Sequence, residues 1–342
     1  MNSSIAITSV LTFLCSIKLL LGSSPGYVIG WGHNSAGEAI GFRLSEAATG
    51  NVEIDGKPIS DAIAIAAGKN HALAIREDGT VVGWGLNLYG QTNVPIGLKN
   101  SVAISAGKNF SIALNRKGEV SVWGDGRDGQ TTVPDIARDV VAISAGVSHA
   151  LALRHDGTVV RWGQSNATMP DNLTNVSRIA AGGGKFDRNL VLRKDGTLLG
   201  WGTEHVPQGI SNVTEIAIGD LHSLALKTDG TVFGWGNNNH GEATGIPSPN
   251  RQRYTSGLVI KSGHVLSNVV AIAAGNEYGV FGTFCRYSLA LKNDGTVVAW
   301  GVVDGKPVTV PGGLSNIVAI AAGYGFSLAI TTNAAVAARF RY

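Results

Sequence analysis

A repeated pair of residues, Trp-Gly, constrains the fold of this chain more than any other feature of its sequence. Glycine follows every tryptophan, at Trp31, Trp84, Trp123, Trp162, Trp201, Trp235 and Trp300. A second mark, a glycine that ends an alternating apolar run, also recurs, at Gly68, Gly107, Gly146, Gly182, Gly219, Gly275 and Gly323. Its successive intervals are 39, 39, 36, 37, 56 and 48 residues. A period near 40 indicates a repeat architecture.

Each repeat predicts a strand, a loop, a second strand, a tight turn and a third strand. In the unit marked by Gly68 we expect strands over 63–67, 72–76 and 80–85. Asp78-Gly79 before the last strand predicts a two-residue type I′ hairpin, which needs positive φ at both central residues. The pair recurs at Asp156-Gly157, Asp195-Gly196, Asp229-Gly230 and Asp294-Gly295. An apolar period of two with repeated hairpins excludes helical repeats and indicates the blades of a β-propeller.

The two ends of the repeat array complement each other. Gly323 has no Trp-Gly after it, and Trp31 has no glycine mark before it. Joining them gives seven complete units, so we expect residues 27–32 to complete the sheet begun by residues 317–331. This pairing would remove an exposed sheet edge. The sequence therefore predicts an all-β, seven-bladed β-propeller closed by the N-terminal strand, with a residual strand over 335–339 whose place stays open.

Composition agrees with this fold and excludes several classes of protein. Glycine supplies 47 of 342 residues, about twice its usual share, whereas charged residues are 15% against about 25% in an average protein. A net charge of only +3 argues against a nucleic-acid partner. The two cysteines, Cys15 and Cys285, are too few for a disulfide framework or a thiolate zinc site.

The first residues predict a targeting segment. An apolar run over 5–21 precedes Gly22-Ser23-Ser24-Pro25, as in a secretory signal peptide. No basic residue precedes this run, and Lys18 interrupts it, which leaves too little apolar length for a membrane anchor. We expect a signal peptide over 1–24, a single propeller domain over 25–342, and a secreted, periplasmic or cell-surface location. A cytosolic chain is the alternative.

The repeats resemble those of the regulator of chromosome condensation family. The best copy runs from Ala67-Gly68 through His71 and Asp78-Gly79 to Trp84-Gly85, followed by Asn87, Gly90 and Gln91. The short spacer from Trp84 to Pro95 is closer to bacterial members, and among these the chain is similar to propeller-type β-lactamase inhibitory proteins. The resemblance covers about residues 27–331. It implies a β-propeller, but one fold serves many partners, so it says little about function.

No catalytic or cofactor-binding constellation emerges from the motifs. The histidines after the glycine marks (His71, His149 and His222) are replaced in other units by Phe110, Arg188, Tyr287 and Phe326, which excludes a repeated metal site. We expect them to fill a niche in the turn and to satisfy backbone groups there. Each tryptophan is expected to pack between neighbouring blades. The sequence thus predicts a protein that is not an enzyme and needs neither a metal nor a cofactor.

Insertions concentrate where we expect function. They lie at 33–60, 237–268, 276–286 and 183–187, in loops that strand alternation places at one end of the blades. Loops on a rigid scaffold tend to carry function, and Arg and aromatic residues are enriched at protein interfaces. The candidate partner-binding residues are His240, Arg251, Arg253, Tyr254, Tyr278, Phe281 and Phe284.

The leading functional hypothesis is a non-enzymatic, monomeric protein-interaction module, in a narrower version an inhibitor of an extracellular enzyme. The alternatives are guanine-nucleotide exchange or another regulatory activity, which the eukaryotic members of the family suggest, and a lectin-like propeller. The predicted signal peptide and the absence of a basic N-terminal tail argue against the exchange factor.

Overall fold

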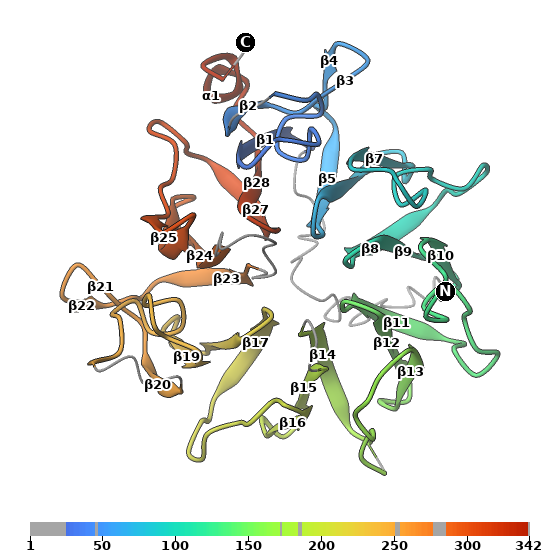
Figure 1. The fold of residues 1–342 in the computed structure, drawn as a ribbon, viewed down its shortest axis with the longest axis vertical. Helices are drawn as coiled ribbons and strands as arrows, with labels where there is room; N and C mark the ends of the chain where they lie inside the picture. Colours follow the sequence, from blue (N-terminus) through green and yellow to red (C-terminus); the bar gives the residue numbers. More distant parts are fainter. Residues whose placement is uncertain are drawn as a thin grey trace, which may run out of the picture.

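The computed structural model describes residues 25–44, 47–171, 173–183, 187–249, 254–275 and 285–340. In this part of the chain, antiparallel sheets of three or four strands lie around a common centre, with two short hairpins at the periphery (Figure 1). The sheets are numbered here in the order of the ring. The first is β5 (Ala62–Ala67), β6 (His71–Arg76) and β7 (Val81–Gly85); the second is β8 (Ser101–Ala106), β9 (Phe110–Asn115) and β10 (Val120–Gly124); the third is β11 (Val140–Ala145), β12 (His149–Arg154) and β13 (Val159–Gly163).

The remaining sheets follow the same strand order, and three of them have a fourth strand. The fourth is β14 (Val176–Gly182), β15 (Arg188–Arg193) and β16 (Leu198–Gly202); the fifth is β17 (Val213–Ile218), β18 (His222–Lys227), β19 (Val232–Gly236) and β20 (Thr255–Leu258). The sixth is β23 (Val269–Ala274), β24 (Cys285–Lys292), β25 (Val297–Val303) and β26 (Lys306–Pro307); the seventh is β27 (Ile317–Ala322), β28 (Phe326–Thr331), β1 (Tyr27–Gly32) and β2 (Ala48–Asn51). The hairpins are β3 (Glu53–Ile54) with β4 (Lys57–Pro58), and β21 (Ile260–Lys261) with β22 (His264–Val265).

The seventh sheet joins strands from the two ends of the described chain. β1 runs antiparallel to β28, with Tyr27 opposite Thr331 and Gly32 opposite Phe326. Val28, Ile29 and Trp31 on β1 are buried, so this strand contributes a substantial apolar area to the core.

The glycine marks lie where neighbouring sheets approach each other most closely. A Cβ added to Gly68 would lie 2.5 Å from the carbonyl oxygen of Gly107 in the next sheet. It would also lie 2.6 Å from Cε1 of the His71 ring, which folds back over the glycine. Gly323 repeats this arrangement, with its Cβ position 2.8 Å from the Gly68 oxygen. Only glycine fits these contacts, which explains why glycine recurs at this place in the sheets.

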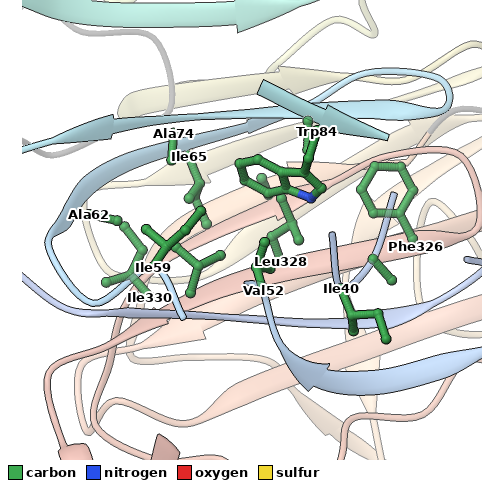
Figure 2. Packing of buried hydrophobic residues seen from close by; sticks show 14 of the residues in the cluster. Ile40, Val52, Ile59, Ala62, Ile65, Ala74, Trp84, Phe326, Leu328 and Ile330 are labelled. Atoms are coloured by element: carbon green, nitrogen blue, oxygen red, sulfur yellow. The ribbon is translucent and has the colours of Figure 1, made fainter. Parts of the chain in front are cut away.

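The tryptophans pack between sheets, as the sequence predicts. Trp84 on β7 lies among Ile40, Phe326 and Leu328 from the seventh sheet and its following loop (Figure 2). Its Nε1–H donates to the carbonyl oxygen of Glu38 at 3.0 Å. The glycine after each tryptophan has positive φ, from 80° at Gly202 to 106° at Gly32, and so turns the chain out of its strand.

The Asp-Gly turns are not the expected type I′ hairpins. Glycine has positive φ at these turns (80° at Gly79), whereas Asp78 is not among the positive-φ residues. The backbone N–H of Arg76 donates to Thr80 O, which makes a three-residue loop of Glu77, Asp78 and Gly79. Asp78 Oδ1 accepts from both the N–H and the hydroxyl of Thr80, at 2.8 and 2.7 Å, and this explains the recurrent Asp-Gly-Thr.

The expected strand over 335–339 is a helix instead, α1 (Ala334–Ala338). Alanine has the highest helix propensity, and four of the five residues are alanine. The side chain of Asn333 caps the helix by accepting from the N–H groups of Ala335 and Val336. Because α1 lies beyond β2 at the outside of the ring, it does not compete with β1 for the edge of β28 (Figure 1).

Parts of two insertions add strands at the outer edge of the molecule. The insertion over 33–60 forms β2 beside β1 and then the β3–β4 hairpin, and the insertion over 237–268 forms β20 beside β19 and the β21–β22 hairpin (Figure 1). The segments 276–284 and 184–186 of the other two insertions lie outside the described residues.

Candidate functional site

The order of strands gives the ring two chemically different faces. The innermost strand of each sheet ends at its glycine mark and the third strand ends at Trp-Gly, so both loops start at the same end of the sheet. We call this end the loop face. The Asp-Gly turns lie at the opposite end, the turn face.

A cavity of about 280 Å³ opens at the loop face, around the inner ends of the first to fifth sheets and the seventh. We call it the mouth cavity. Its lining combines backbone at glycine marks with side chains from the loops that follow them, among them Lys69, Lys108, Ser148, Asp187, Asp220 and Tyr324. These residues come from different sheets, so the cavity exists only when the sheets are assembled around one centre.

Charges of both signs face the mouth cavity. Burial and, to a smaller extent, the repulsion of Lys108 lower the pKa of Lys69, and the attraction of Asp220 opposes this shift. The Lys69 ammonium also lies 5.7 Å from the centre of the Tyr324 ring, within the range of a cation–π contact. Such a mixed lining suits a polar or zwitterionic surface more than a purely apolar ligand.

Apolar side chains are exposed on the loops that follow Trp-Gly. Leu88 and Tyr89 follow the first sheet and are 76% and 40% exposed. Phe42 and Leu44 follow β1, and Ile246 follows β19. The Arg127 guanidinium lies 4.6 Å from the centre of the Tyr89 ring, so the loops of the first and second sheets touch each other. Exposed aromatic and apolar groups beside arginine are typical of protein-binding surfaces.

Two of the seven predicted partner-binding residues lie in the described part of the chain. His240 and Tyr254 are both exposed, Tyr254 at 68%, and both lie in the insertion that starts at the loop face after β19. Arg251, Arg253, Tyr278, Phe281 and Phe284 lie outside the described residues. Their role in binding stays a prediction.

The histidines after the glycine marks connect neighbouring sheets. Nε2 of His71 lies 3.0 Å from Ser111 Oγ on the next sheet, and Ser111 in turn donates to Gln91 O at 2.7 Å. His149 and His222 contact Asn189 and Ser288 in the same way. The expectation that these rings satisfy groups of their own turn is therefore wrong, because each reaches a polar side chain 40 or 66 residues further along the chain.

Burial keeps these histidines neutral. It lowers the pKa of His71 to about 4 and that of His222 to about 3. Arg188 takes the equivalent position in the fourth sheet, where its guanidinium pairs with the buried carboxylate of Glu204 and donates to Ser223 Oγ at 3.0 Å.

The structure also assembles a group that sequence reasoning missed. Ligand-type atoms of His33, Cys285 and Asp304 all lie within 4.8 Å of one another. The residues are far apart along the chain, so no motif reveals them, and only the pairing of β1 with β28 brings His33 to the sixth sheet. Burial, with a further contribution from Asp304, raises the pKa of the Cys285 thiol to about 12, so the free thiol stays protonated at neutral pH and is a poor nucleophile.

The turn face carries a second, more open hollow of about 380 Å³. Charged side chains line it, among them Arg116, Lys117, Asp139, Arg154 and Asp156, and the last two pair with each other at 3.1 Å. Because these groups belong to solvated turns that recur around the ring, we regard the mouth cavity as the better candidate site.

Among the described residues, no helix has both the length and the apolar character needed to cross a membrane.

Comparison with a family model identifies repeats within the chain. The model of the regulator of chromosome condensation (RCC1) repeat matches residues 62–91, 102–130 and 213–242. These segments cover the first sheet, nearly all of the second and the first three strands of the fifth. The chain therefore carries repeats of this type, as the resemblance predicted. A comparison with curated proteins finds no match.

Solved structures share the fold over almost the whole chain. Yeast RCC1 (Prp20), solved with Kap60, superposes with a TM-score of 0.70 at 19% identity, covering 99% of this chain and 97% of that one. Prp20p from Saccharomyces cerevisiae gives 0.68 at 19% identity, with 93% and 94% covered. Human WBSCR16 gives 0.68 at 19% identity, with 90% and 100% covered. The chain thus has an all-β, RCC1-like propeller fold.

Proposed function

We propose that this chain is a secreted, non-enzymatic module that binds a protein partner through the loop face. The observation that carries the proposal is the set of exposed apolar and aromatic side chains on loops that start at the loop face, where the mouth cavity also opens. The sheets hold these loops rigidly, which lowers the entropy lost on binding. In the Asp-Gly-Thr turns of the opposite face, each aspartate accepts a hydrogen bond from the threonine of its own turn. These turns therefore present mainly charged groups to a partner.

Proteins of similar fold support a protein partner. The Prp20p structure is described together with the binding of that protein to Gsp1p and histones, and yeast RCC1 was solved bound to Kap60. These partners belong to those proteins. For the present chain we propose an extracellular protein partner, in the narrower version an enzyme that the module inhibits, because the first residues predict secretion.

The binding surface can be tested with matched variants. A triple variant, Arg253→Ala, Tyr254→Ala and Phe281→Ala, should abolish capture of the partner while leaving the melting temperature nearly unchanged. The control is a triple alanine variant of Lys117, His155 and Asp156 on the turn face, which should retain binding. If the turn-face variant lost binding and the Arg253, Tyr254 and Phe281 variant kept it, the binding site would lie on the turn face instead.

We further propose that the seven sheets form a seven-bladed propeller closed by β1. The pairing of β1 with β28 and the burial of Val28, Ile29 and Trp31 support this proposal. A chain starting at residue 33 should lose several kcal/mol of unfolding free energy, because each buried apolar side chain contributes about 1.5–3 kcal/mol. A chain starting at residue 25 is the control. Equal stability of the two would contradict closure by β1.

Two other functions make different predictions. An exchange factor would accelerate nucleotide release from a small GTPase and would occur inside the cell. A lectin would bind immobilised glycans and would be displaced by free sugar. Recovery of the chain in culture supernatant, with a mature N-terminus near residue 25, would support secretion and disfavour the exchange factor.

A further inference from the structure

We propose that His33, Cys285 and Asp304 form a zinc-binding site at the loop face, between the sixth and seventh sheets. The three residues supply one nitrogen, one sulfur and one oxygen donor, and these are the donor types that Zn²⁺ accepts. This inference is independent of the proposed partner.

The donor atoms are spaced for a single ion. Cys285 Sγ lies 4.0 Å from His33 Nδ1 and 4.0 Å from Asp304 Oδ1. The ligand-type atoms of the three residues lie within 4.8 Å of one another. Adjustment of the side chains, chiefly of the exposed Asp304, would bring the three donors to the usual Zn–S, Zn–N and Zn–O distances.

The imidazole of His33 presents Nδ1 to the sulfur and Nε2 to Oδ2 of Asp304. The two ring nitrogens point to opposite sides, so the Asp304 carboxylate must leave Nε2 to bind an ion held by Nδ1 and Sγ. Asp304 is exposed, so its side chain has room for this movement.

The surroundings make room for the ring. The backbone N–H of His33 donates to Gly325 O at 2.9 Å, and the ring lies edge-on to Tyr324. A Cβ on Gly325 would lie 2.3 Å from His33 Nδ1, so only glycine allows the ring to occupy this position.

The other two donors come from regular elements of the sixth sheet. Cys285 is the first residue of β24, is fully buried and pairs with Val303 of β25. Asp304 and Gly305 form the two-residue turn between β25 and β26, with φ of 51° and 71°. This type I′ geometry places Asp304 beside the sulfur. If the site held no ion, an ordinary His33–Asp304 ion pair would account for the contact between these two side chains. It would not account for the buried Cys285 thiol beside them.

The test uses the full chain in a Cys15→Ser background, so that Cys285 is its one thiol. After stripping with a chelator, the protein is dialysed against Zn²⁺, and bound metal is counted by mass spectrometry. We expect one equivalent, and Cys285→Ser, His33→Gln and Asp304→Asn should each weaken binding by about 100-fold. The controls are His240→Gln, an exposed histidine of the loop face, and Asp55→Asn, which lies in a turn of the same geometry (φ of 51° at Asp55 and 71° at Gly56).

Cobalt gives a readout that does not depend on the folding of variants. Co²⁺ bound to the unsubstituted site should show a thiolate-to-cobalt absorption band in the near ultraviolet, and Zn²⁺ should displace it. No retained metal, or metal without the thiolate band, would overturn the site. Equal loss of binding in the controls would also overturn it.

Discussion

Two sheet interfaces of the ring solve the same packing problem with different chemistry. Between the first and second sheets, neutral His71 contacts Ser111, which donates to the backbone oxygen of Gln91. Between the fourth and fifth sheets, Arg188 takes the position of the histidine and Ser223 that of the serine. Here the carboxylate of Glu204 accepts from Ser223, where a backbone oxygen accepts at the first interface.

The length of one loop explains the difference. Fifteen residues connect β7 to β8, and their Gly90-Gln91 turn brings the Gln91 oxygen to Trp123 Nε1 at 2.9 Å. Only ten residues connect β16 to β17, so this turn is missing. Glu204 reaches into the same place, and its Oε1 accepts from both Trp235 and Ser223. The buried carboxylate of Glu204 pairs with a cation, which Arg188 supplies.

The largest expected effect comes from breaking the charged interface. Glu204→Gln leaves the Arg188 guanidinium buried without its counter-charge, which should cost about 3–5 kcal/mol of unfolding free energy. The matched control is Gln91→Glu at the neutral interface, since Glu38 and Glu242 occupy the equivalent place after β1 and β19 and are also buried. Chemical denaturation should show a much smaller loss for the control, and similar losses would mean that charge pairing is not the difference.

These two interfaces also show how far the sequence determines the fold. The glycine marks, Trp-Gly pairs and Asp-Gly-Thr turns are local, so their spacing predicts the strands to within one residue in the first sheet (β5 at 62–67 against 63–67 expected). The turn type was wrong because Thr80 stabilises a three-residue loop through Asp78, which the Asp-Gly pair alone does not reveal. The expected strand over 335–339 is a helix because alanine favours helix and the Asn333 side chain caps its first turn.

The candidate sites were harder to predict than the fold. The Arg188–Glu204 pair could have been suspected from an arginine at a position that holds His or an aromatic ring in the other units. The cluster of His33, Cys285 and Asp304 leaves no pattern, because its members meet only through the packing of the sixth and seventh sheets. The mouth cavity likewise depends on all the loops together, so the repeat indicates its face but not its lining.

The next largest effect is the dependence of stability on pH, which should differ between the two interfaces. The pKa of His71 is lowered from 6.5 to about 4, so between these pH values the unfolded chain binds a proton that the folded chain does not. Stability should therefore fall as the pH drops from 6.5 to 4, and the His71 share of this loss is roughly 3 kcal/mol. Arg188 keeps its charge throughout this range.

A His71→Phe variant isolates that share, because Phe110 and Phe326 show that the position accepts this ring. Its unfolding free energy should depend less steeply on pH than that of the unsubstituted chain, with His149 and His222 accounting for the remainder. Unchanged pH dependence between pH 4 and 6.5 would contradict the assignment of a buried neutral His71.

The smallest effect comes from the serine that each interface uses as a relay. Ser111→Ala removes two neutral hydrogen bonds, one with His71 Nε2 and one with Gln91 O, which still accepts from Trp123, so the loss should be about 1–2 kcal/mol. Ser223→Ala removes bonds to two charged groups, Arg188 and Glu204, and should cost about 1.5–3 kcal/mol. Both serines are fully buried, so the two substitutions leave cavities of similar size and the difference reports the charge. Denaturation of the two variants side by side measures it, and a larger loss for Ser111→Ala would show that the charged interface does not depend on its serine.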